Sequence, residues 1–288
     1  MLILGVNGLA LEAGKNLVLS GTGEVFFCDE GRKVTEADVG ADRVLFYLDA
    51  THLGQGLAEA LRPALQDLNP HVKVHALSAV PLDLTAFDLV AYVGGSVARA
   101  VTLSQQCRAA EVKFLAAAAW GFHAWALLDL GNAHKFTESH PRKRTPDMPK
   151  DVDPGKEDVP LEFAYKPLDD VLGASWDARV FRRLPPLFYV LQAKLASERD
   201  GVSVREAMDK LLKDAGKDWD SAPRGLTVEA LDQIVASIGI ESMPVCAITG
   251  GLVAADIGKI VSGKGTPTRN TLLLDTAGRT GGVSVFIG

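Results

Sequence analysis

The order of apolar and polar positions predicts a chain in which short buried strands alternate with amphipathic helices. Residues 2–5 form an apolar run, and the stretch 9–21 then repeats its apolar residues at helical spacing. A second apolar run over 24–29 closes in Asp29. This alternation is typical of right-handed β–α–β units built around a mostly parallel sheet. The pattern therefore predicts a Rossmann-like α/β fold.

The same pattern continues along the chain. Helical periodicity is found over 53–70 and 96–111, and strand-like runs are found over 72–79, 87–94, 112–121 and 123–131. The segment 161–240 is mainly helical, with Gly201 ending one helix and with Ser203 and Thr227 as N-caps of two others. The last residues, 270–288, read as two short strands joined by a glycine-rich turn, which predicts an antiparallel hairpin.

Residues 135–160 interrupt this pattern. They contain six Lys or Arg, six Asp or Glu and five Pro, with few apolar residues. Such a segment cannot bury enough surface to offset its chain entropy, so we predict an exposed, flexible charged loop. The loop divides the domain into a first part, 1–134, and a part over 161–288 that completes the same domain. Its "HPRKRTP" string is either a nuclear-import patch or a solvated basic cluster.

Composition and charge narrow the class of protein. The 288 residues are 47% hydrophobic and 23% charged, as in ordinary globular proteins, and the net charge of −6 argues against a nucleic-acid partner. We expect no membrane span, because no apolar run reaches about 18 residues. We expect no secretory signal, because "MLILGVNG" has no basic segment before its apolar part and no small-residue cleavage site. Cys28, Cys107 and Cys246 are too far apart for a zinc site, so we expect buried, reduced thiols.

The candidate ligand-binding residues lie just after the first and second predicted strands. Gly5 and Gly8 follow it, as in a loop whose backbone N–H groups bind phosphates at a helix N-terminus. Asp29, at the end of the second strand, is placed to hold ribose hydroxyls. The alternative is a turn that keeps glycine only for close packing. We find no motif typical of a serine nucleophile, a metalloprotease or a P-loop.

Four strings together resemble one family, the ubiquitin-like activating enzymes with their adenylation-type fold. They are "GVNGLALEAGKNLVLSG", "FFCDEGRKVTEADVG", "VKFLAAAAWGFHAWALLDLG" and "MPVCAITGGLVAADIGKIVSGKGTPTRNTLLLD". Within that family the chain is most similar to the non-catalytic half of the SUMO-activating heterodimer. The inactive half of an enzyme for another modifier, ubiquitin or NEDD8, is the next alternative.

The resemblance also shows where this chain departs from the catalytic halves of the family. Active halves carry the pattern G-x-G-G-x-G, a second acid after the second strand, an Asn and an Arg in the next loop, a phosphate-binding Lys and a magnesium-binding Asp. The matching positions here are Asn7 and Ala10, Gly31, Val39 and Gly40, Leu57, and Gly94 with Gly95. The resemblance therefore implies a vestigial loop of Gly5, Gly8 and Asp29, with no cofactor, metal or catalytic residue of its own.

The resemblance further implies a heterodimer. Mg-ATP and the thioester-forming cysteine would belong to a catalytic subunit, and the modifier would be SUMO or another ubiquitin-like protein. The candidate contact residues lie on a helix rich in small side chains: Pro244, Val245, Gly250, Gly251, Ala254 and Ala255. The same residues also fit the core of this chain, and the two interpretations are compatible. We expect the chain in the nucleus, or in both nucleus and cytoplasm.

One departure from the family pattern and two alternative functions remain open. Family members carry a helix with an arginine before the first strand, whereas this chain opens directly on "MLIL", so the arm is either truncated or missing. A free-standing NAD-binding enzyme would show dinucleotide affinity, and a homodimeric sulfur-carrier adenylating enzyme would need an intact ATP site in each chain.

Overall fold

The structure is a computed structural model that describes residues 1–40, 44–142, 155–176, 184–276 and 283–285. Its strands are β1 Leu2–Leu4, β2 Glu24–Cys28, β3 Lys73–Leu77, β4 Leu89–Val93, β5 Lys113–Trp120, β6 His123–Asp129, β7 His134–Pro141, β8 Lys156–Phe163, β9 Thr271–Asp275 and β10 Val283–Val285. Its helices are α1 Gly8–Leu19, α2 Glu36–Val39, η1 Ala50–His52, α3 Leu57–Gln66, α4 Val97–Ala109, α5 Leu168–Leu172, α6 Pro186–Asp200, α7 Val204–Asp214, α8 Val228–Ala236 and α9 Met243–Ser262.

The described strands other than β7 and β8 form one eight-stranded sheet in the order β10-β9-β6-β5-β4-β1-β2-β3. Strands β3, β2, β1, β4 and β5 are parallel, while β6, β9 and β10 run antiparallel to their neighbours. Strand β1 pairs with β2 on one side and β4 on the other, so the order of the strands reverses there. Ligands of doubly wound folds bind beside such a switch point, at the carboxyl ends of the strands.

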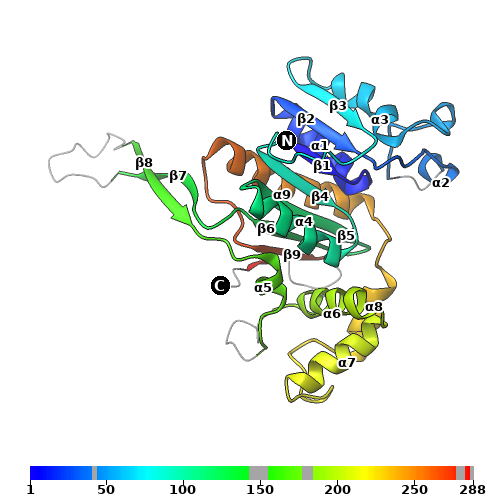
Figure 1. Ribbon diagram of the computed structural model, residues 1–288, viewed down its shortest axis with the longest axis vertical. Helices are drawn as coiled ribbons and strands as arrows, with labels where there is room; N and C mark the ends of the chain where they lie inside the picture. The colour runs from blue at the N-terminus through cyan, green and yellow to red at the C-terminus, as the bar shows by residue number, and fades with distance from the viewer. Residues whose placement is uncertain (41–43, 143–154, 177–183, 277–282, 286–288) are drawn as a thin grey trace.

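Helices cover both faces of this sheet (Figure 1). Alternate residues of β5 point to opposite faces, so Leu115 and Ala117 pack with α1, α3 and α9, while Phe114 and Ala116 pack with α4 to α8. Strands β1 and β4 are buried at every position, as expected for parallel strands between two helical layers. The predicted α/β class, with its helical segment and terminal antiparallel hairpin, is confirmed.

The helical segment begins and ends where its sequence predicts. Pro186 opens α6, and Gly201 ends it in the left-handed conformation with φ of 70°. Ser203 caps α7 through a capping box with Glu206, and the Thr227 side chain caps α8. These helices supply the leucines and aromatic residues that cover one face of the sheet.

The charged segment between the two parts of the chain contains two strands, which corrects the prediction of a loop over the whole of 135–160. Strands β7 and β8 pair antiparallel in a two-stranded ribbon that extends away from the main sheet (Figure 1). Phe136 and Phe163 pack on the same ribbon as the charged side chains, with their ring centroids 4.9 Å apart. Residues 143–154, the middle of the predicted loop, lie outside the described residues.

Helix α9 is long and apolar enough, by length and composition alone, to cross a membrane. In this structure its inner face packs on α1 and on strands β5 and β6, as a core helix does. Pro244 stands in its first turn, and Gly263 ends it with φ of 65°. The helix is therefore a structural part of the sheet domain.

Candidate functional site

The turn after β1 keeps its first glycine for a geometric reason. Gly5 has φ of 93°, and a Cβ atom there would lie 2.1 Å from the Val93 carbonyl oxygen. No side chain fits between this turn and the end of β4, so glycine is required whether or not a ligand binds. Asn7 caps α1, because its Oδ1 accepts a hydrogen bond of 2.9 Å from the Ala10 amide.

The remaining amides of this turn are already bonded to a carboxylate of the same chain. Glu241, just before α9, accepts a hydrogen bond of 2.9 Å from the Gly8 amide and one of 3.3 Å from the Leu9 amide. Burial raises the pKa of the Glu241 carboxyl above its ordinary value, while these two amide bonds act in the opposite direction. The carboxylate therefore lies at the positive end of the α1 dipole, where a phosphate group would bind in a nucleotide site.

Asp29 also has a structural role at this edge of the sheet. It is buried, and its two oxygens accept hydrogen bonds of 2.8 Å each, from the Gly31 amide and from the Ala58 amide at the start of α3. Leu57, the residue before Ala58, is fully buried in the core. Asp29 thus holds the β2 turn against α3, and both of its oxygens are engaged.

A third carboxylate occupies the start of α4. Glu198 of α6 accepts hydrogen bonds from the Ala98 amide at 2.7 Å and from the Ser96 hydroxyl at 3.0 Å. Gly94 lies just before this turn, and a Cβ atom added there would come within 2.6 Å of the Tyr92 hydroxyl. A larger residue at 94 would have to displace that ring, whereas a Cβ atom at Gly95 would lie 4.0 Å from the Trp120 ring nitrogen. Of the two positions matched to a magnesium-binding aspartate, only Gly94 therefore lacks room for one.

Two residues that the sequence analysis missed lie at the mouth of the same region. Arg32 donates hydrogen bonds to Asp38 at 2.5 Å and to the Val6 carbonyl at 3.2 Å. Burial opposes ionisation of Asp38, but hydrogen bonds from Thr35 and the charge of Arg32 hold its pKa below the ordinary value. Val39 and Gly40, the positions matched to nucleotide-binding residues, are the last residue of α2 and its C-cap.

These groups surround a cavity of about 270 Å³ at the switch point. Its lining includes the loop after β1, the loop after β4 and the linker before α9, through Asn7, Arg32, Gly94, Gly95, Trp120 and Glu241. A nucleotide triphosphate does not fit this donor set, because the amides that would bind its phosphates already donate to Glu241 and Asn7. In the described part of the chain, no three His, Cys, Asp or Glu side chains lie together as a metal site requires.

The three cysteines are free and buried. Burial raises the pKa of the Cys107 thiol to about 12, and it also raises the pKa values of Cys28 and Cys246. A thiol needs a lowered pKa and solvent access to act as a nucleophile, and these three have neither.

The candidate contact residues of α9 divide between two faces. Val245, Gly250 and Ala254 are buried inside the chain, whereas Pro244 and Ala255 are exposed and Gly251 is partly exposed. Four large apolar side chains of α9 also lie on its exposed half, each at least 40% exposed: Met243, Ile248, Leu252 and Val261. We call this set the outer face of α9.

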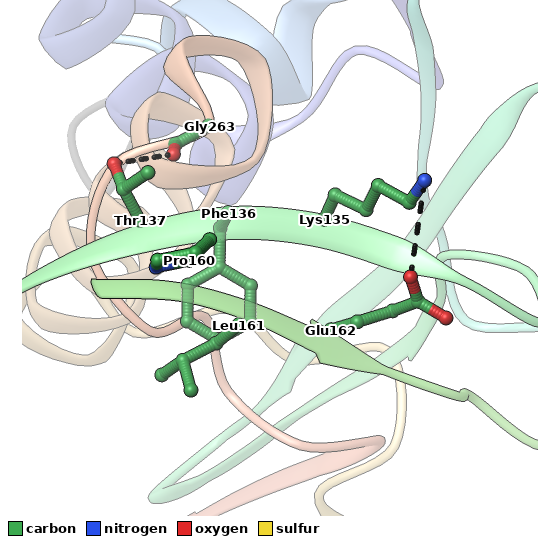
Figure 2. A pocket seen from close by; sticks show the side chains of 7 residues that line it. All are labelled: Lys135, Phe136, Thr137, Pro160, Leu161, Glu162 and Gly263. Carbon is green, nitrogen blue, oxygen red and sulfur yellow. Dashed lines mark hydrogen bonds and ion pairs between the residues drawn. The ribbon is translucent and has the colours of Figure 1, made fainter. Parts of the chain in front are cut away.

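A larger cavity, of about 460 Å³, lies far from this edge, against the β7–β8 ribbon. Figure 2 shows Thr137 turned toward Gly263 after α9, and Lys135 opposite Glu162 across the ribbon. The Thr137 hydroxyl donates to the Gly263 carbonyl at 3.3 Å, and the Lys135 and Glu162 charges lie 3.9 Å apart. The charged groups here are paired and none is aimed at a common point, so the cavity offers no catalytic arrangement.

The chain is similar along nearly its whole length to one group of curated proteins, although no protein-family profile matches it. It is 27% identical over 304 residues to SUMO-activating enzyme subunit 1 of Xenopus tropicalis, covering 96% of this chain and 86% of the relative. The resemblance to SUMO-activating enzyme subunit 1 thus extends over nearly the whole chain. Similar relatives include that subunit in Danio rerio, at 27% identity over 99% of this chain and 88% of the relative, and subunit 1B-1 of Arabidopsis thaliana, at 27% over 96% and 85%.

The similarity to SUMO-activating enzyme subunit 1 over nearly the whole chain confirms the resemblance inferred from the four sequence strings. The glycines and the aspartate that the strings singled out, Gly5, Gly8 and Asp29, do converge at the switch point. The residues that occupy that point, Glu241, Glu198 and Arg32, come from elsewhere in the chain and carry no sequence motif. The only signal in the sequence is that each is a charged residue, and a charged residue near a helix cap or turn is a weak indication of a site.

Proposed function

We propose that this chain is the regulatory, catalytically degenerate subunit of a heterodimeric SUMO-activating enzyme. A catalytic partner would adenylate the C-terminus of the modifier with Mg-ATP and then form a thioester with it. The observation that carries the proposal is that carboxylates of this chain occupy the helix starts at the switch point of the sheet, in a chain whose sequence is similar over 96% of its length to SUMO-activating enzyme subunit 1.

The charges at the switch point support an assignment of nucleotide chemistry to the partner. ATP brings several negative charges, and its binding needs free amides, cations and a metal-binding acid. Here amides at the starts of α1, α3 and α4 already donate hydrogen bonds to the carboxylates of Glu241, Asp29 and Glu198, respectively. The cation of Arg32 is already paired with Asp38. We therefore propose that this chain binds no ATP and no metal.

The outer face of α9 supports a protein partner. Exposed apolar side chains on a helix whose opposite side is buried on α1 are typical of an interface residue set. Its small residues, Gly251 and Ala255, would let another helix approach closely. We propose that the catalytic subunit docks on this face.

Pyrophosphate exchange tests the proposed division of labour. The purified chain, with Mg-ATP and SUMO, is expected to show no ATP–pyrophosphate exchange, whereas addition of a catalytic subunit is expected to give exchange. Exchange by this chain alone would refute the proposal, and so would a stable monomer that never associates with the catalytic subunit. Replacing SUMO by ubiquitin or NEDD8 in the same assay identifies the modifier, and exchange only with another modifier would reassign the subunit.

A matched pair of substitutions tests the docking face. Leu252→Arg places a charge on the outer face of α9, while Leu82→Arg places the same charge at a fully exposed leucine in the loop between β3 and β4. We expect Leu252→Arg to weaken co-purification with the catalytic subunit at least tenfold, because a charge would be buried without a partner. Leu82→Arg should leave it unchanged. If both variants bound the catalytic subunit equally well, the proposal that α9 contributes to the interface would be refuted.

We also propose a nuclear location. The basic string "HPRKRTP" begins at the end of β7, and its residues from 143 onward lie outside the described ones. Fluorescence imaging of the chain with the basic residues of that string replaced by Ala should show it spread into the cytoplasm. An unchanged nuclear signal would exclude the string as the import signal.

A further inference from the structure

We infer that Glu241 is a built-in anion that takes the place of a ligand phosphate at the start of α1, so that its removal uncovers a site for inorganic phosphate. The inference concerns how this chain closes its own cavity. It does not rest on the proposed function, because the cavity would be closed in the same way whatever the partner or modifier.

The hydrogen bonds at the start of α1 have the pattern that a bound anion would receive. The two Glu241 oxygens bond separately to the Gly8 and Leu9 amides, and Asn7 accepts from the next amide, Ala10. The four leading amides of a helix have no partner inside the helix and therefore need an outside acceptor. A carboxylate at this end also gains from the helix dipole. Removing it would leave adjacent amides without acceptors.

The backbone around Glu241 fixes its position. The Ile240 carbonyl accepts a hydrogen bond of 2.7 Å from the Gly121 amide in the β5–β6 turn. On the other side, Ser242 is the N-cap residue of α9, and its carbonyl accepts from the Cys246 amide at 2.8 Å. Backbone hydrogen bonds on both sides of Glu241 therefore fix the position of its carboxylate, which distinguishes it from a mobile surface side chain.

The cavity beside Glu241 holds other donors that suit an anion. Trp120 lines it, and its ring nitrogen is buried without a hydrogen-bond partner among the described residues. Arg32 also lines it, and its charge balances that of Asp38, another lining residue with which it is paired. With Glu241 present, its negative charge opposes the entry of a second anion. Without it, the Gly8 and Leu9 amides would face a cavity of about 270 Å³, which is large enough for phosphate.

Thermal unfolding in phosphate tests this inference. Wild type, Glu241→Ala and the control Glu157→Ala are compared in 10 mM sodium phosphate and in sodium chloride of equal ionic strength. Glu157 is exposed on β8, so its variant loses the same charge without freeing helix amides. We expect phosphate to raise the Tm of Glu241→Ala by about 2 °C, while the other two proteins show no specific rise.

Hydrogen exchange locates the effect. In Glu241→Ala the Gly8 and Leu9 amides should exchange faster than in wild type, and phosphate should slow them again. Equal phosphate responses in all three proteins, or a response that leaves these amides unprotected, would overturn the inference. If Glu241→Ala gives no folded protein, Glu241→Gln replaces it, since the amide keeps the volume but can accept only through one oxygen. Unchanged protection of both amides in Glu241→Gln would then overturn the inference.

Discussion

Two neighbouring glycines of α9 test how closely this helix packs on α1. A Cβ atom at Gly250 would lie 2.6 Å from the Glu12 Cβ and 2.8 Å from the Ala13 nitrogen. At Gly251, one position along, a Cβ atom would meet nothing within 4 Å. The two residues share the same helix and the same glycine backbone, so they differ mainly in what surrounds them.

The magnitude follows from two opposing terms. Replacing a helix glycine by alanine stabilises a helix by about 0.5–1 kcal/mol. At Gly250 the new methyl group would be about 1 Å closer to its neighbours than carbon atoms normally pack. Forcing such a group into a packed core typically costs about 1–3 kcal/mol, and one of the obstacles here is backbone. We expect Gly250→Ala to lose about 1–2 kcal/mol and Gly251→Ala to gain up to about 1 kcal/mol.

Denaturant unfolding of the isolated chain measures this difference. The midpoints of the two variants should move in opposite directions from wild type, with an unchanged slope that indicates the same surface exposed on unfolding. Circular dichroism at the start of each titration checks that the helices are intact. If Gly250→Ala were as stable as Gly251→Ala, the close crossing of α1 and α9 would be refuted.

Two further predictions concern buried charges near the ribbon end of the sheet. Burial, and to a lesser extent the charge of Lys113, lowers the pKa of His134 to about 4. Between about pH 6.5 and pH 4 the unfolded chain therefore carries a proton on this histidine that the folded chain does not bind. Unfolding titrations should lose up to roughly 3 kcal/mol across that interval, and His134→Phe should remove this part of the slope; an unchanged slope would contradict the assignment. Arg108 pairs with the buried Asp129, so Arg108→Met should cost about 2–3 kcal/mol at pH 7 and less in acid, where protonation relieves the unpaired carboxylate. A cost that does not depend on pH would mean that the pair contributes through packing alone.

Local pattern accounts for most of the fold. The caps Ser203 and Thr227 and the terminator Gly201 act within a few residues, which is why the sequence predicts their helices well. The ribbon was missed because its charge and proline content outweighed a weaker signal. Val159, Leu161 and Phe163 do alternate with polar residues, as an edge strand requires, but Pro160 interrupts the run.

The candidate site was harder to predict because its decisive contacts are long-range. The loop residues Gly5, Gly8 and Asp29 lie next to recognisable strands, and their placement at the switch point was predictable. Glu241 lies 233 positions from Gly8 and has no motif of its own. Nothing in the local sequence distinguishes it from the many exposed glutamates. The resemblance predicts the absence of several nucleotide-binding groups, but it says nothing of the carboxylates that accept hydrogen bonds from the helix amides.

The helix amides at the switch point show how a strand-to-helix turn can be stabilised without a bound ligand. The leading amides of a helix need acceptors whether or not a phosphate is present. Here those acceptors come from the second half of the chain, Glu198 on α6 and Glu241 after α8. Those helices therefore stabilise the sheet domain in two ways, by covering its apolar face and by satisfying the starts of α4 and α1. A variant lacking them would lose both, so removing the helical segment would leave the starts of α4 and α1 without their carboxylate acceptors.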